Sequence, residues 1–181
     1  SSAASDVYKR QVFTLILFGM FIPYQAVMVP LVQLMSNLGV PSGVPSLIVL
    51  HVVYGLPITT LIFRNYYAGV PVELVEAARV DGAGMLRTYG SIILPISAPA
   101  FVVVLMWQFT SAWNDYLFAL FFSTSQNGPV TIALNFLASG QLQDYSASMA
   151  GALIASVPTL IIYILLGRYF VGGLMAGSVK G

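Results

Sequence analysis

Four long apolar runs limit what this chain can fold into. Each is close to or above the about 20 residues that a membrane-spanning helix needs; they cover residues 13–35, 45–63, 95–122 and 147–166. Charged residues make up only 7% of the 181 residues, against about 25% in soluble domains. Because a segment in lipid must satisfy its own backbone groups, we predict an all-α, polytopic membrane bundle with about four spans.

Composition excludes several other classes of protein. The net charge is +1, so nothing in the charge balance favours a nucleic-acid partner. The chain has no cysteine, which leaves no disulfide framework and no thiolate metal site. We interpret His51, the single histidine, as a hydrogen-bonded residue between helices rather than a ligand or proton carrier. We therefore expect no metal and no cofactor.

One charged segment, residues 64–94, separates the second run from the third. It holds three arginines, two glutamates and one aspartate, which is six of the thirteen charged side chains in the protein. Charges are costly in hydrocarbon. We therefore expect this segment, called the charged loop below, to lie in water and to meet a partner there.

The charged loop has the local chemistry of two short helices separated by a break. Pro71 suits a first helical turn, and acidic residues near the start with Arg79 near the end follow the helix dipole. Gly82 predicts a helix end in the left-handed conformation. A second helix is expected over residues 83–93, ended by Pro95.

A spaced pattern runs through the charged loop. It reads Glu-Ala-Ala, three residues, Gly, nine residues, Ile, one residue and Leu-Pro, and falls on Glu76, Ala77, Ala78, Gly82, Ile92, Leu94 and Pro95. This pattern resembles the Glu-Ala-Ala loop of ABC-importer permeases, which is cytoplasmic and docks into a cleft of the ATPase subunit. The resemblance implies that five residues couple the chain to the ATPase: Glu76, Ala77, Ala78, Asp81 and Gly82. Without it, the segment is an ordinary amphipathic loop helix.

The C-terminal residues 168–181 carry a second signature. Gly-Leu, Ala-Gly and Val-Lys-Gly follow one another in this tail, which resembles the end of the maltose- and glucose-type sugar permeases. Read alone, the tail is a flexible, glycine-rich terminus. With the loop, the resemblance covers most of residues 12–181, which we interpret as an ABC transporter transmembrane (type 1) domain.

The resemblance implies a membrane-spanning subunit of an ATP-driven, binding-protein-dependent importer that moves a sugar by alternating access. The implied partners are a dimer of ABC ATPase subunits, a second permease subunit that is a paralogue, an extracytoplasmic solute-binding protein and the lipid bilayer. The implied location is the prokaryotic plasma (inner) membrane. Permeases of this branch have six spans, so we expect that the first two are missing here.

The chain contains no Gly-x-x-x-x-Gly-Lys-[Ser/Thr] phosphate-binding loop. We therefore expect that it has no enzyme activity and that a partner subunit hydrolyses ATP. An ATP-independent secondary carrier or channel is the alternative. Such a protein would need a charged or ion-coordinating site at the membrane midplane, and the apolar runs hold few charges.

The lysines and arginines predict the orientation of the spans. With the charged loop inside the cell, four spans also place Arg168 and Lys180 inside. The two outer loops, residues 36–43 and 123–145, contain neither lysine nor arginine. The charged loop and the C-terminus are therefore expected to be cytoplasmic.

Residues 1–11 are polar and join abruptly to the first apolar run. They lack the layout of a signal peptide. We expect a non-native or unstructured segment here, and a genuine cytoplasmic segment is the alternative.

A polar group interrupts the third apolar run at Trp113, Asn114, Asp115 and Tyr116. An ionisable group at membrane depth usually faces a bundle interior or a watery cavity, and the two aromatic rings suit stacking on a sugar. These four residues are therefore candidates for the solute path. The alternative is an interfacial position of Asp115 within an aromatic belt.

Overall fold

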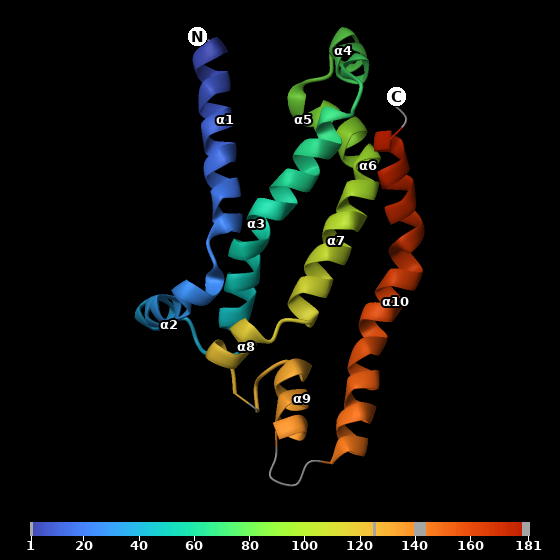
Figure 1. Ribbon diagram of the computed structural model, residues 1–181. Helices are drawn as coiled ribbons and strands as arrows, with labels where there is room; N and C mark the ends of the chain where they lie inside the picture. The colour runs from blue at the N-terminus through green and yellow to red at the C-terminus, as the bar shows by residue number, and fades with distance from the viewer. Residues whose placement is uncertain (1, 125, 140–143, 179–181) are drawn as a thin grey trace. The chain divides into compact units, whose positions relative to one another are not determined.

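The computed structural model describes the chain except for residues 1, 125, 140–143 and 179–181 (Figure 1). Helices make up its regular structure, and no strand occurs in the part that it describes. The predicted all-α fold class is therefore confirmed.

The elements follow one another in chain order, with short 3-10 turns and one π-helical segment among the α-helices. They are α1 (Ser2–Phe18), 3-10 turns at Gly19–Phe21 and Tyr24–Val27, α2 (Met28–Asn37), α3 (Val44–Ala68), α4 (Val72–Val80), α5 (Met85–Thr88), the π-helical segment Tyr89–Ile93, α6 (Leu94–Ile96), α7 (Ala98–Trp113), α8 (Leu117–Phe122), α9 (Val130–Ser139) and α10 (Tyr145–Ser178).

Two helical stretches, Val44–Ala68 and Tyr145–Gly167, are long and apolar enough to cross a membrane alone. Two further candidates are bent pairs: Val7–Phe21 with Tyr24–Asn37 at 86°, and Met85–Ile96 with Ala98–Trp113 at 65°. By length and composition, the predicted four spans are reached only if each bent pair counts as one span.

The first predicted span, residues 13–35, is thus not one continuous helix. The break lies at Ile22 and Pro23, where Pro23 takes an extended conformation with ψ 107°. Proline has no N–H to continue the helical bonding and its ring crowds the preceding turn. Residues 2–11, expected to be a non-native or unstructured segment, form the first part of α1.

The third predicted span, residues 95–122, also differs from the expected helix. The helix from Met85 passes through Pro95 and ends at Ile96, so Pro95 does not terminate it. A π-helical segment, in which the Leu94 N–H bonds to the Tyr89 carbonyl, precedes the proline, and Pro95 lies in the first turn of α6, where its missing N–H is tolerated. At the other end, α7 stops at Trp113 and α8 is separate.

The C-terminal tail is more regular than expected. Read without the resemblance, residues 168–181 were expected to be a flexible terminus, whereas α10 continues through Ser178. Val179, Lys180 and Gly181, which belong to the sugar-permease signature, lie outside the described residues.

The chain divides into two compact units. Unit 1 comprises Ser1–Ile58 and Gln108–Ile161, and unit 2 comprises Thr59–Trp107 and Ile162–Gly181. Each is considered by itself below.

Unit 1 has a buried core around α8. Phe118, Ala119 and Phe122 of α8 are at most 6% exposed, and they join Met28, Met35, Leu47, Leu50 and Ile132 in one cluster. The Gly43 N–H donates to the Phe122 carbonyl at 2.6 Å, which ties the start of α3 to the end of α8.

Candidate functional site

The first helix of the charged loop forms as its sequence predicts. Pro71 has φ −59° and ψ 129° and precedes α4, one residue outside the helix rather than in its first turn. Glu73 lies in the first turn and Arg79 in the last. Each charge therefore faces the helix end of opposite partial charge.

Gly82 ends α4 in the left-handed conformation, as predicted, with φ +74°. The Gly82 N–H donates to the Arg79 carbonyl at 3.0 Å, and the Ala83 N–H donates to the Ala78 carbonyl at 2.9 Å. These two bonds make a Schellman motif, which satisfies carbonyls that the helix end leaves unpaired. Nothing lies within 4 Å of a Cβ built on Gly82, so the backbone conformation alone favours glycine here.

The predicted coupling residues differ in exposure. Glu76, Ala77, Asp81 and Gly82 are exposed on α4 and the turn that follows it. Ala78 is only 4% exposed and packs within its own chain. A partner can therefore approach the backbone at Ala77 and Gly82, whereas Ala78 is buried and packs α4 against the rest of its own chain.

Three apolar side chains of the same loop are almost fully exposed. Val80 is 88% exposed, Met85 87% and Leu86 85%. Sequence reasoning missed these three residues, although apolar side chains within a charged segment are a usable signal. Exposed apolar groups gathered on a loop are typical of surfaces that a partner covers.

Asp115, in unit 1, is held by the backbone and by His51. Its carboxylate accepts hydrogen bonds from the N–H groups of Phe118, at 3.3 Å, and Ala119, at 3.1 Å. These bonds satisfy two donors in the first turn of α8. Its Oδ2 lies 3.6 Å from Nε2 of His51, and both side chains are mostly buried.

The other candidate path residues do not converge on one point. The Trp113 indole donates to the Ala155 carbonyl of α10 at 2.9 Å, and its ring stacks on Phe109. Asn114 is exposed, whereas Tyr116 is partly buried against the core. The polar atoms of Trp113 and Asp115 thus serve packing within unit 1.

An aromatic cluster surrounds Phe118 near Asp115. The rings of Tyr54, Tyr24 and His51 lie with centroids 5.1, 5.4 and 5.7 Å from that of Phe118. Sequence reasoning missed this cluster, because its members come from three separate segments that only the tertiary fold brings together.

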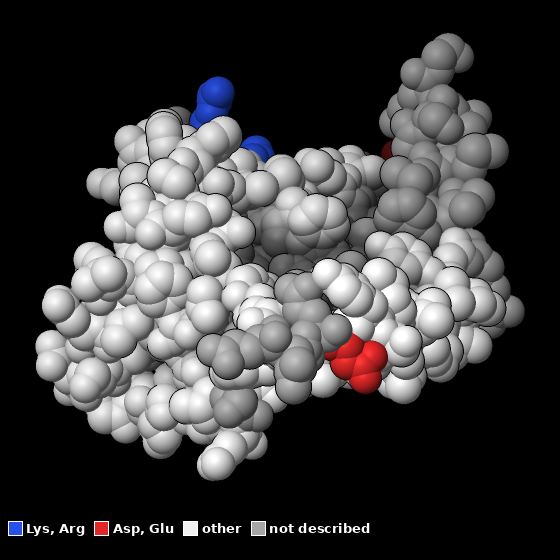
Figure 2. Space-filling view, turned by 60° about the horizontal axis from the view of Figure 1, so that its bottom comes forward, with Lys and Arg blue, Asp and Glu red and all other residues white. Residues whose placement is uncertain are grey.

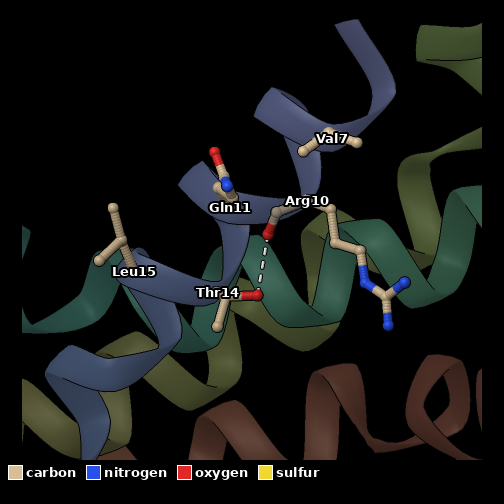
Figure 3. Close-up of a pocket in the computed structure, with 5 residues that line it drawn as sticks. All are labelled: Val7, Arg10, Gln11, Thr14 and Leu15. Carbon is tan, nitrogen blue, oxygen red and sulfur yellow. Dashed lines mark hydrogen bonds between the residues drawn. The ribbon is translucent and has the colours of Figure 1, made fainter. Parts of the chain in front are cut away.

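Charge is scarce among the described residues on the face drawn in Figure 2, where white predominates, one acidic patch stands out and basic groups lie at the rim. A hollow beside α1 is lined by Val7, Arg10, Gln11, Thr14 and Leu15 (Figure 3). All five lining residues belong to one helix, and the Thr14 hydroxyl donates to the Arg10 carbonyl at 2.8 Å. The hollow contains none of the predicted site residues.

Long apolar helices joined by a charged, Schellman-capped loop define a polytopic helical membrane protein. The model of the family described as binding-protein-dependent transport system inner membrane component matches residues 2–173. The chain belongs to this family.

Curated relatives agree with this assignment. A probable ABC transporter permease protein of Pyrococcus horikoshii is 46% identical over 96% of this chain and 63% of its own length. The xylose/arabinose import permease protein of Haloferax volcanii is 38% identical, over 92% of this chain and 62% of its own length. The glucose import system permease protein of Saccharolobus solfataricus is 33% identical, over 100% and 63%. The chain thus spans about three fifths of the length of these relatives.

Proposed function

We propose that this chain is the membrane-spanning subunit of an ATP-driven, binding-protein-dependent importer for a sugar. The observation that carries the proposal is α4 with its Schellman turn, which presents Glu76, Ala77 and Gly82 on the surface of unit 2. The names of the relatives, which include xylose/arabinose and glucose import permeases, support a sugar as the solute.

The proposed mechanism is alternating access. Closure of a separate ATPase dimer moves α4, and the spans respond by opening the solute path towards an external binding protein. A second permease subunit, a paralogue of this one, completes the path. Glu76 makes a charge-assisted contact with a basic group on the ATPase, and Asp81 adds negative charge beside it.

A role of residues 113–116 in the solute path stays a prediction. Asn114 is the exposed member of this group, and Asp115 also caps α8. An effect of an Asp115 substitution on transport therefore has to be separated from an effect on packing.

The proposal is tested by charge reversal at two acidic positions of α4. Glu76→Lys should abolish co-purification with the ATPase, because truncating one partner of a desolvated charge pair costs about 2–5 kcal/mol and each 1.4 kcal/mol is about tenfold in affinity. Glu73→Lys is the matched control, since Glu73 is also exposed on α4 but lies in its first turn. Equal, normal recovery of the ATPase with both variants would remove the coupling assignment.

A further inference from the structure

Residues at the start of the charged loop are hydrogen-bonded to residues just beyond its end, inside unit 2. The Tyr66 hydroxyl, at the end of α3, donates to the carbonyl of Ile96. The hydroxyls of Tyr67 and Ser97 are joined by a bond of 3.2 Å. Each bond connects residues thirty positions apart, so the segment between them is closed at its base.

Ser97 is the point at which the helix Met85–Ile96 bends into α7, and it is 0% exposed. Its hydroxyl donates to the Ile93 carbonyl at 2.5 Å. Ser97 Oγ also donates to the Tyr67 hydroxyl, so its single hydrogen is shared between these two acceptors.

Aromatic packing supports the same junction. The Tyr67 ring stacks on Phe63 with centroids 5.9 Å apart, and Phe63 meets Phe101 of α7 edge-on at 4.7 Å. Apolar contacts gain little in lipid, where the surroundings are equally apolar, whereas hydrogen bonds between helices still stabilise their association. The hydroxyl bonds are therefore the part of the junction that gives it a defined geometry.

Hydrogen-bonded turns connect α4 to both sides of this junction. Gly69 and Val70 donate to the carbonyls of Tyr66 and Tyr67, which links the end of α3 to the start of α4. On the other side, the Schellman turn leads from α4 into the helix Met85–Ile96. A displacement of α4 is thus passed to the end of α3 and to the start of α7 through short, hydrogen-bonded connections.

We propose that Tyr66, Tyr67 and Ser97 are positioning residues that clamp the base of the charged loop, so that α3 and α7 follow α4 together. This inference rests on the proposed coupling of the loop to an ATPase. Without the clamp, the two helices separate at their ends and the displacement of α4 is absorbed there.

The test uses the double variant Tyr66→Phe/Tyr67→Phe in the complex assembled with its ATPase. Phenylalanine keeps the rings and removes only the hydroxyls. Loss of each hydroxyl should shift the equilibrium between the closed and the open clamp by about two- to tenfold towards the open form, as loss of one hydrogen bond does. Tyr163→Phe is the control, because Tyr163 is a half-exposed tyrosine of α10 in the same unit.

The readout is the distance between spin labels at Asn65→Cys and Ala98→Cys, both exposed positions in a chain without other cysteines. In the native background and in the control, we expect one narrow distance distribution with and without ATP. In the double variant, ATP should broaden it, while the ATPase still co-purifies and hydrolyses ATP. A narrow, unchanged distribution in the double variant would overturn the clamp.

Failure of the clamp and failure of the proposed function are distinguishable in this experiment. If the ATPase does not co-purify even with the native chain, the proposed coupling function is wrong. If it co-purifies, responds to Glu76→Lys and leaves the label distances of the double variant unchanged, only the clamp is wrong.

Discussion

Gly82 and Gly84 lie two residues apart in the charged loop but differ in backbone conformation. Gly82 has φ +74°, which favours glycine, whereas Gly84 has φ −69°, which any residue adopts. A Cβ on either glycine meets nothing within 4 Å. The pair therefore separates the effect of backbone conformation from the effect of space.

Gly82→Val should distort the end of α4 and weaken co-purification of the ATPase, because a β-branched residue resists the left-handed region and even an unbranched one loses about 1–2 kcal/mol there. Gly84→Val should leave co-purification close to native. The measurement is recovery of the ATPase after solubilisation, with membrane insertion checked separately. Equal recovery for both variants would show that the turn is not needed for docking.

Asp115 invites a substitution series, because its carboxylate holds two N–H groups of α8 and faces His51. Asp115→Ala should lower the stability of unit 1 by about 0.5–2 kcal/mol, the range for a lost helix cap. The stability of Asp115→Asn should lie between that of the native chain and that of Asp115→Ala, since an amide oxygen still accepts one of the two hydrogen bonds. Thermal unfolding in detergent measures this series. A native melting temperature together with lost sugar uptake in Asp115→Ala would instead favour the solute path.

Among the elements, those set by local chemistry were predictable and those set by tertiary contacts were not. The end of α4 at Gly82 follows from a glycine after a helical segment, and the left-handed conformation was predicted correctly. The passage of a helix through Pro95 was not, because Pro95 falls in the first turn of α6, after a π-helical segment. The bond from Trp113 to Ala155 joins residues 42 positions apart, and no sequence periodicity indicates it.

Within unit 1, α3 and α7 approach closely at Gly55. A Cβ there would lie 2.4 Å from Oε1 of Gln108, whose amide nitrogen donates to the His51 carbonyl at 2.9 Å. Gly55→Ala should therefore displace Gln108 and lower stability. In the double variant Gly55→Ala/Gln108→Ala, the clash is absent, so the two effects should not add. Strict additivity in thermal unfolding would contradict this contact.

At the scale of the whole molecule, the sequence predicts which side of the membrane each loop lies on more directly than it predicts the course of the helices. Two single helices and two bent pairs are consistent with as many as four crossings, and the distribution of lysine and arginine supplies their direction. A bend near Pro99 was a possibility that the length of the third run allowed, whereas the break at Pro23 was not predicted, since proline tolerated within a span and proline breaking a span look alike in the sequence.

Reporter fusions test this orientation. Fusions after Asn65 and after Lys180 should report a cytoplasmic position, and a fusion near Gly128 should report an external one. The reason is the presence of Arg64, Arg79 and Arg87 on one side and the absence of lysine and arginine from residues 36–43 and 123–145. An external signal at Asn65 would remove the basis for contact between the charged loop and an ATPase.

The bonding of the turn at Gly82 determines how the shape of the charged loop responds to ionic strength. The bonds that shape it run from the N–H groups of Asp81, Gly82 and Ala83 to the carbonyls of Ala77, Arg79 and Ala78, all between backbone atoms. Added salt screens interactions between exposed charges, but these hydrogen bonds join uncharged backbone groups, which salt does not screen. The loop should therefore keep its shape from dilute buffer to concentrated salt. Any dependence of ATPase binding on salt then reports the charges that meet at the contact, and not a change in the loop that presents them.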